Sequence, residues 1–159
     1  MSEPLSKHEK NLSAAIHAST FSRFFVPFGN LLLPLVLWLA NKNDSPFVDY
    51  NGKQALNFQI SLILYSVVLG ALSIPFFFGF FPELFNHGFM GWGDWGHFNG
   101  PNFNFDWDDF PFRRIWPLGF AGLIPVALFI VNVVYTILAT LRTNEGQTFK
   151  YPITINFIK

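Results

Sequence analysis

Two long stretches without a charged side chain constrain this chain more than any other feature of its sequence. The chain carries no charge between Lys53 and Glu83, and residues 115–141 carry none either. A helix needs about 20 mainly apolar residues to cross the roughly 30 Å hydrocarbon core of a bilayer. We therefore predict two full transmembrane helices, at residues 53–75 and 114–142.

The composition agrees with lipid as the solvent of this chain. Hydrophobic residues make up 51% of the sequence, charged residues only 13%, and the mean hydropathy is +0.33. Soluble domains carry about 25% charged residues. The net charge is zero and no basic cluster exceeds one adjacent pair, so nucleic acid is not an expected partner. The absence of cysteine excludes disulfides, thiol nucleophiles and cysteine-ligated metals.

The first apolar region, residues 12–41, is interrupted in its middle. An unbroken helix over it would be about 40 Å long, more than a bilayer core requires. We predict two shorter pieces instead, 14–26 and 31–40, which form either a tight helical hairpin or one bent span. The interrupting residues are Pro27, Gly29, Asn30 and Pro34.

The distribution of Lys and Arg favours the hairpin, because both residues prefer the cytoplasmic flanks of membrane helices. With a hairpin, seven basic residues outside the first piece share one side and two lie on the other; with a bent span, the division is five against four. The hairpin places both termini, residues 1–11 and 143–159, in the cytosol. It also makes the loop 42–52 cytosolic and the segment 76–113 external.

Two local patterns refine these boundaries. Ser45 followed by Pro46 is a helix-start signal, because a serine hydroxyl can cap free amides and proline fits the first turn. In the last eleven residues, 149–159, apolar Ile and Phe alternate with Thr and Asn. This alternation is typical of a strand or of an extended strip at the membrane interface.

Uncharged polar side chains recur at helical spacing on one face of each predicted span. One interpretation is hydrogen bonding between the two helices, at about 0.6 kcal/mol per contact; the other is a polar groove for a passing peptide or solute. Arg23 joins this set because a cation in lipid is costly enough to suggest a function, unless it snorkels or lies at the interface. The candidate intramembrane polar face consists of Arg23, Gln54, Asn57, Ser61, Asn132 and Thr136.

The segment 76–113 combines aromatic residues with glycine, asparagine and acidic residues. Aromatic side chains are favoured at membrane interfaces and in protein contacts, so we predict that this segment is a partner-binding loop. The candidate contact residues are Phe89, Trp92, Trp95, Phe103 and Trp107.

The same segment contains two patterns that suggest a ligand site only by their letters. Residues 91–96 match the dinucleotide fingerprint G-x-G-x-x-G, but neither the preceding strand nor the following helix that the motif needs is expected here. The His and Asp residues follow no calcium or zinc spacing. We therefore predict no catalytic residue, no cofactor and no metal site.

Several local strings resemble a family of small bacterial membrane proteins of unknown function. They are Phe24–Leu39, Ser45–Asp49, Gly52–Gln59 and Tyr151–Ile155. That family is distantly similar to the membrane-embedded subunit of the protein translocon in the chloroplast inner envelope. The resemblance implies a four-crossing helical fold, a bacterial inner-membrane location and, more weakly, protein transport. The long segment 76–113 and the charge of Arg23 depart from the family pattern.

The sequence thus predicts an all-α polytopic membrane protein with a broken N-terminal hairpin and two full transmembrane helices. Its expected function is that of a non-enzymatic subunit or accessory factor of a larger membrane complex, one that handles protein translocation or insertion. The alternative is a small oligomeric transporter or channel that uses the polar face. The expected partners are the lipid bilayer and either another protein or further copies of the chain.

Overall fold

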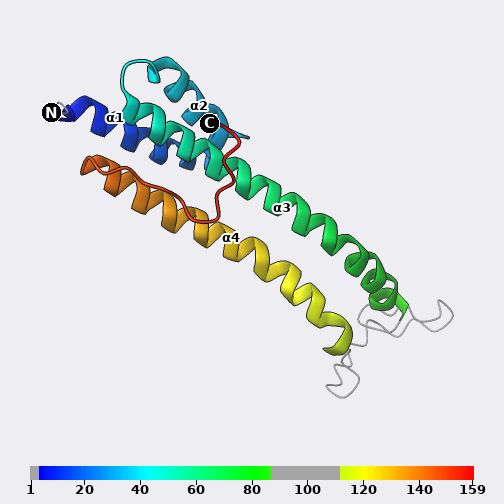
Figure 1. Cartoon of the computed structure of the whole chain (residues 1–159). Helices are drawn as coiled ribbons and strands as arrows, with labels where there is room; N and C mark the ends of the chain where they lie inside the picture. Colours follow the sequence, from blue (N-terminus) through cyan, green and yellow to red (C-terminus); the bar gives the residue numbers. More distant parts are fainter. Residues whose placement is uncertain (1–3, 87–111) are drawn as a thin grey trace. The chain divides into compact units, whose positions relative to one another are not determined.

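The computed structural model describes residues 4–86 and 112–159, and these residues are helical over most of their length (Figure 1). The elements are α1 (Lys7–Ala18), the 3₁₀ helix η1 (Ser19–Phe24), α2 (Gly29–Asn41), α3 (Pro46–Asn86) and α4 (Phe112–Asn144). No strand occurs among the described residues, which confirms the predicted all-α fold. Two stretches, Pro46–Pro75 of α3 and Gly122–Asn144 of α4, are long and apolar enough to cross a membrane.

Helix α3 extends beyond the predicted span 53–75 at both ends. It begins at Pro46, where the serine and proline signalled a helix start, so much of the predicted loop 42–52 is helical. It continues past Pro75 to Asn86. A proline inside a helix removes a single backbone hydrogen bond, and membrane helices tolerate this loss. Part of the predicted segment 76–113 therefore belongs to α3, and its last residues belong to α4.

The chain divides into two compact units. The first unit contains residues Met1–Tyr65 and Leu128–Lys159, and the second contains Ser66–Ala127. All of α1, η1 and α2, the first half of α3, the end of α4 and the C-terminal segment thus belong to the first unit. The polar side chains discussed below lie in this unit.

The N-terminal region is broken at residues 25–28, between η1 and α2. Ser6 begins α1 with a capping box, in which its hydroxyl accepts from the Glu9 amide and the Glu9 carboxylate accepts from the Ser6 amide. Phe28 has a left-handed backbone with φ of 59° at the start of α2. The next residue, Gly29, packs so closely on Ser22 that a Cβ would lie 2.6 Å from the Ser22 hydroxyl oxygen. Whether this region crosses the membrane as a hairpin stays a prediction.

Two apolar clusters hold the first unit together. The first joins α1, α2 and α3 and contains Ile16, Trp38, Val48, Ala55 and Leu56. The second joins α3, α4 and the C-terminal segment and contains Phe58, Leu62, Ala139 and Tyr151. At Gly52 a Cβ would clash with Cδ1 of Trp38, so the missing side chain lets α2 approach α3 closely.

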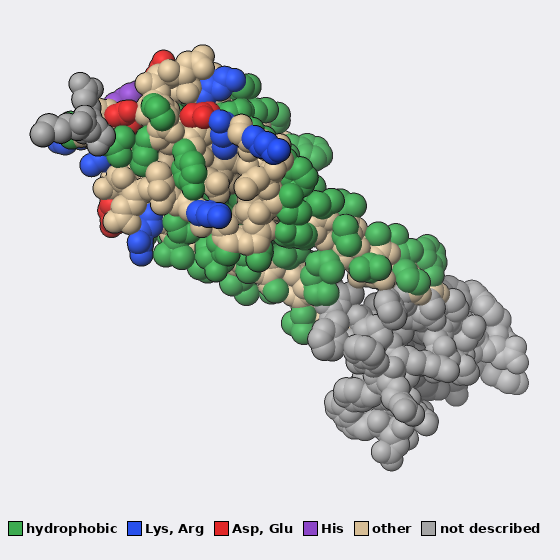
Figure 2. Space-filling model, in the orientation of Figure 1, with side chains coloured by type: hydrophobic (Ala, Val, Ile, Leu, Met, Phe, Trp, Pro, Cys, Tyr) green, Lys and Arg blue, Asp and Glu red, His purple; other side chains and the backbone are tan. Residues whose placement is uncertain are grey.

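Large apolar side chains are also exposed along the long helices (Figure 2). On α3 they include Val67, Val68 and Leu72, and on α4 they include Leu123 and Ile130. Soluble monomers rarely expose so many large apolar side chains on one helix. This surface is the one expected of helices whose outer faces contact lipid.

Candidate functional site

The polar face of α3 does not point into an open channel, because it holds the last residues of the chain. We call residues 149–159 the tail. In Figure 1 the tail runs back from the end of α4 and crosses to α3. It forms neither helix nor strand, and it turns at residues 152–153, where Ile153 has a φ of 55°. Its location at the membrane interface stays a prediction.

Both ends of the Asn57 side-chain amide form hydrogen bonds with the backbone of the tail. Its Nδ2 donates to the carbonyl oxygen of Ile158 at 3.0 Å. Its Oδ1 accepts from the backbone amides of Phe157 at 3.1 Å and Ile158 at 2.8 Å. One buried side chain therefore satisfies three main-chain groups of the tail.

Two further residues continue this contact along α3 at intervals of one helical turn. The hydroxyl of Ser61 accepts from the amide of Ile155 at 2.9 Å and donates to the carbonyl of Asn57 at 2.7 Å. The hydroxyl of Tyr65 donates to the carbonyl of Ile153 at 2.7 Å. The tail therefore runs antiparallel to this part of α3, and Tyr65, Ser61 and Asn57 bind Ile153, Ile155 and Phe157–Ile158 in turn.

The opposite side of α3 carries a polar residue that links three helices. Gln59 accepts from Asn30 of α2 at 3.0 Å and donates to Oδ1 of Asn132 of α4 at 2.9 Å. The hydroxyl of Thr136 donates to the same Oδ1 at 3.3 Å. Polar groups inside a membrane protein need internal partners, and this chain of hydrogen bonds supplies them.

The predicted polar face is therefore two networks rather than one. Asn57 and Ser61 bind the tail, whereas Asn132 accepts from both Gln59 and Thr136. Among the described residues, no hydrogen bond joins the first pair to the second. Gln59 is not part of the predicted polar face, because it lies on the other side of the helix. Pairing every Asn and Gln of both spans would have pointed to it.

Two sets of predicted residues lie elsewhere. Arg23 is exposed on η1 and shares no hydrogen bond with the polar networks in the part of the chain that the structure describes. The candidate loop contacts lie outside the described residues: Phe89, Trp92, Trp95, Phe103 and Trp107.

A buried chain of three side chains fixes the start of the tail to α1 and α3. The hydroxyl oxygen of Tyr151 lies 2.8 Å from Nδ1 of His17, and Nε2 of His17 lies 3.4 Å from Oδ1 of Asn51. The amide of Asn51 donates to the carbonyl of Phe47, so its oxygen is left to accept. His17 must then carry its proton on Nε2, and Tyr151 donates to Nδ1. Neither His17 nor Asn51 belongs to the candidate residues predicted from the sequence.

Burial determines the charge states in this cluster. His17 is 0% exposed, and burial lowers its pKa to about 4, although the Asn51 hydrogen bond acts the other way. Burial likewise raises the pKa of Tyr151. The Tyr151 ring stacks on Phe58 with centroids 4.1 Å apart. Both groups are neutral near pH 7 and serve to hold the tail.

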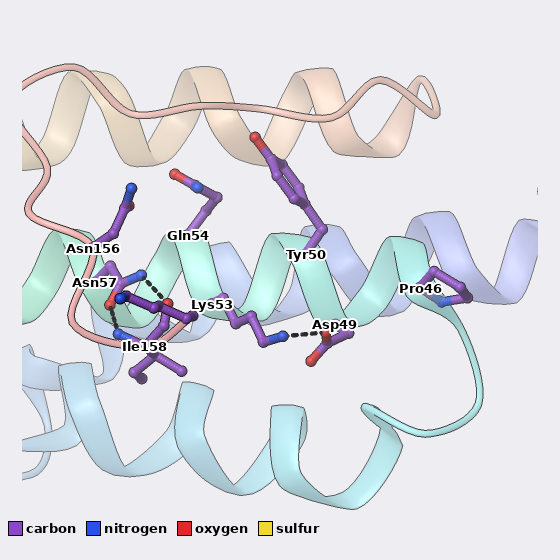
Figure 3. A pocket seen from close by; sticks show the side chains of 9 residues that line it. Pro46, Asp49, Tyr50, Lys53, Gln54, Asn57, Asn156 and Ile158 are labelled. Atoms are coloured by element: carbon purple, nitrogen blue, oxygen red, sulfur yellow. Dashed lines mark hydrogen bonds and ion pairs between the residues drawn. The ribbon is translucent and has the colours of Figure 1, made fainter.

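A pocket opens beside the tail, near the start of α3 (Figure 3). Its volume is about 430 Å³. Asp49 pairs with Lys53 at one side of it and accepts a 2.9 Å hydrogen bond from the Trp38 indole. A second pocket of about 330 Å³ shares this wall and adds Lys42. The first pocket is lined by Pro46, Asp49, Tyr50, Lys53, Gln54, Asn57, Asn156, Ile158 and Lys159.

Comparison with known proteins identifies the family of the chain. No curated protein and no solved structure matches it. The model of a membrane protein family that acts in magnetosome crystal formation matches residues 8–158, nearly the full length. The expected membership in a small membrane protein family is thereby supported, whereas the translocon likeness is not shown. With its spans and its tail inside this match, the chain belongs to the magnetosome magnetite crystal formation protein family.

Proposed function

We propose that the chain is a non-enzymatic membrane subunit of an assembly that forms magnetite crystals. The observation that carries this proposal is the enclosure of the polar groups of the first unit by the chain itself. Asn57, Ser61 and Gln59 are all buried, and each is hydrogen-bonded to the tail or to another helix. Such an arrangement supports a rigid membrane scaffold.

The buried titratable cluster supports the non-enzymatic part of the proposal. His17 and Tyr151 are the residue types that catalyse proton transfer. The two residues are 0% and 2% exposed, and the ring of Tyr151, which belongs to the tail, stacks on Phe58. Neither group is open to a substrate in this conformation.

The subunit part rests on the family and on the aromatic sequence of residues 76–113. A chain with its own polar groups satisfied needs another surface for contact with partners, and aromatic residues are enriched in such surfaces. The family description supports magnetite formation as the process in which such a partner acts. We therefore assign residues 87–111 to binding a protein partner or a further copy of the chain.

Deletion of residues 87–109 in a magnetite-forming cell tests the proposal. We expect the shortened protein to stay in the membrane fraction, its large complex to disappear in native electrophoresis, and crystal size to change in electron micrographs. The variant Lys150→Gln, which leaves the segment intact, is the control. An unchanged complex and unchanged crystals would contradict the proposal.

Protein translocation or insertion is a second candidate, favoured by one observation. Asn57, Ser61 and Tyr65 hold an extended polypeptide through its backbone, and therefore without regard to its side chains. A photo-reactive residue at Tyr65 tests this role. Cross-links to other polypeptides, increased by deletion of residues 152–159, would support it; cross-links to the tail alone would exclude it.

The arrangement gives no support to the transporter alternative. Its four polar residues, Asn57, Ser61, Asn132 and Thr136, are buried and hydrogen-bonded within the chain. The family places the protein in a membrane, with two stretches able to span it. We further propose that this membrane is the bacterial inner membrane and that both termini lie in the cytosol.

A further inference from the structure

The pocket beside the tail has a positively charged rim. Lys53 and Lys159 line it, and Lys42 lines the adjoining pocket that shares the same wall. Asp49 is the one carboxylate side chain among the residues that line either pocket, and it is already paired with Lys53 and with the Trp38 indole. An anion that enters the pocket therefore meets an excess of positive charge.

One of the residues that line this pocket, Gln54, has a buried acceptor without a partner. Gln54 is 8% exposed, and its Oε1 makes no hydrogen bond within the protein. A buried acceptor of this kind costs stability unless a ligand or a water donates to it. Both ends of the neighbouring Asn57 amide already bind the tail. In Figure 3 Gln54 and Tyr50 project from the same side of α3.

The pocket lies at the end of a predicted span, where a ligand can come from the bilayer. Lys53 is the last charged residue before the long uncharged stretch of α3, so it marks the level at which lipid headgroups begin. Pro46 and Ile158 add apolar contacts to the lining. Basic pockets at this level of membrane helices are suited to acidic headgroups.

We infer that this pocket binds a phosphate group, and that the phosphate belongs to the headgroup of an acidic phospholipid. Lys53 and Lys159 supply its positive partners. Tyr50, whose ring is partly exposed, supplies a hydroxyl donor. Oε1 of Gln54 accepts from a hydroxyl of the headgroup, so a glycerol headgroup fits better than bare phosphatidic acid. The bound lipid would fasten the end of the tail to the membrane surface.

Native mass spectrometry of the full chain from nanodiscs tests this inference. The nanodiscs contain equal amounts of phosphatidylglycerol and phosphatidylcholine. We expect the wild type to retain phosphatidylglycerol selectively, and Lys159→Glu to lower this retention on the order of tenfold, because it reverses one charge at the pocket. Lys150→Glu is the matched control: it makes the same charge change on the tail outside the pocket, and retention should be unchanged.

Further measurements separate the pocket from general charge and from folding. Gln54→Leu should lower retention of phosphatidylglycerol but not of phosphatidic acid, which has no headgroup hydroxyl. Melting temperatures in detergent should match the wild type for Lys159→Glu. Equal losses in Lys150→Glu and Lys159→Glu, or equal retention of both lipids by the wild type, would overturn the site. Displacement of the lipid by excess inorganic phosphate would overturn the lipid as the source of the anion.

Discussion

Two neighbouring parts of α3, residues 51–62 and 63–75, differ in polarity and burial in the opposite way from a helix of a soluble protein. Residues 51–62 include Asn51, Gln54, Asn57, Gln59 and Ser61, yet nearly all of this half is buried. Residues 63–75 are almost entirely apolar, yet nearly all of them are exposed or half-exposed.

This difference indicates that the helix is surrounded by lipid rather than by water. In water the polar half would face outward, since exposed polar groups are hydrated at no cost. In lipid an unsatisfied polar group costs several kcal/mol, whereas apolar side chains lose nothing on exposure. The polar half must therefore be enclosed by the chain, and the tail supplies much of that enclosure.

The largest effect is expected from Asn57→Leu, which removes the residue that grips the tail. Three backbone groups of Phe157 and Ile158 lose their partner in part-buried hydrogen bonds, at about 1 kcal/mol each. Thermal unfolding in detergent should show the loss. Amide exchange at residues 155–158 should become at least tenfold faster. Ser66→Leu, in the exposed half, should change neither; equal effects of both variants would break the comparison.

Acid should weaken the enclosed half through His17. The pKa of His17 falls from 6.5 to about 4 on burial, so the folded state takes up its proton later than the unfolded state. The free energy of unfolding is therefore highest above pH 6.5 and decreases as the pH falls towards 4. The decrease is on the order of 2 kcal/mol at pH 5. Unfolding at pH 7 and pH 5 measures this difference. In His17→Gln it should shrink by that amount; an unchanged difference would contradict the assignment.

Two glycines of α3 allow the same substitution in each half. Gly52→Ala should destabilise the protein by about 1–3 kcal/mol, because its Cβ would clash with the buried Trp38. Gly70→Ala meets no atom within 4 Å and should stabilise the helix by up to about 1 kcal/mol. Opposite shifts in melting temperature are therefore expected. Shifts of the same sign would argue against close packing at Gly52.

The smallest effect is expected from two serine substitutions. Ser61→Ala removes the acceptor for the Ile155 amide and should cost about 1 kcal/mol. Ser73→Ala removes a hydroxyl that donates only within its own helix, to the Leu69 carbonyl, and should cost close to nothing. Denaturation in mild detergent compares them. A larger loss for Ser73→Ala would reverse the ranking.

Much of this fold could be predicted from local sequence. The uncharged stretches predicted both long helices, and Ser45 with Pro46 marked the start of α3. Helical spacing picked out Gln54, Asn57 and Ser61, all of which are buried. The helix itself continues to Asn86, past Pro75, because membrane helices tolerate the one backbone hydrogen bond that a proline removes.

The partners of those polar residues could not be predicted in the same way. Asn57 binds main-chain groups some hundred residues away, and a backbone acceptor leaves no mark in the sequence. Tyr151 likewise meets His17 across most of the chain. Helical periodicity shows which face of a helix is polar, but it cannot show whether a second helix, a ligand or the tail covers that face.

Lipid contact of the two halves of α3 tests this account most directly. In nanodiscs, with methyl groups labelled for NMR, cross-peaks to lipid acyl chains report which side chains touch lipid. We expect strong cross-peaks for Val67 and Leu72, and none for Leu56 or Leu62, which are buried. Strong lipid cross-peaks at Leu56 and Leu62, with none at Val67 and Leu72, would contradict it.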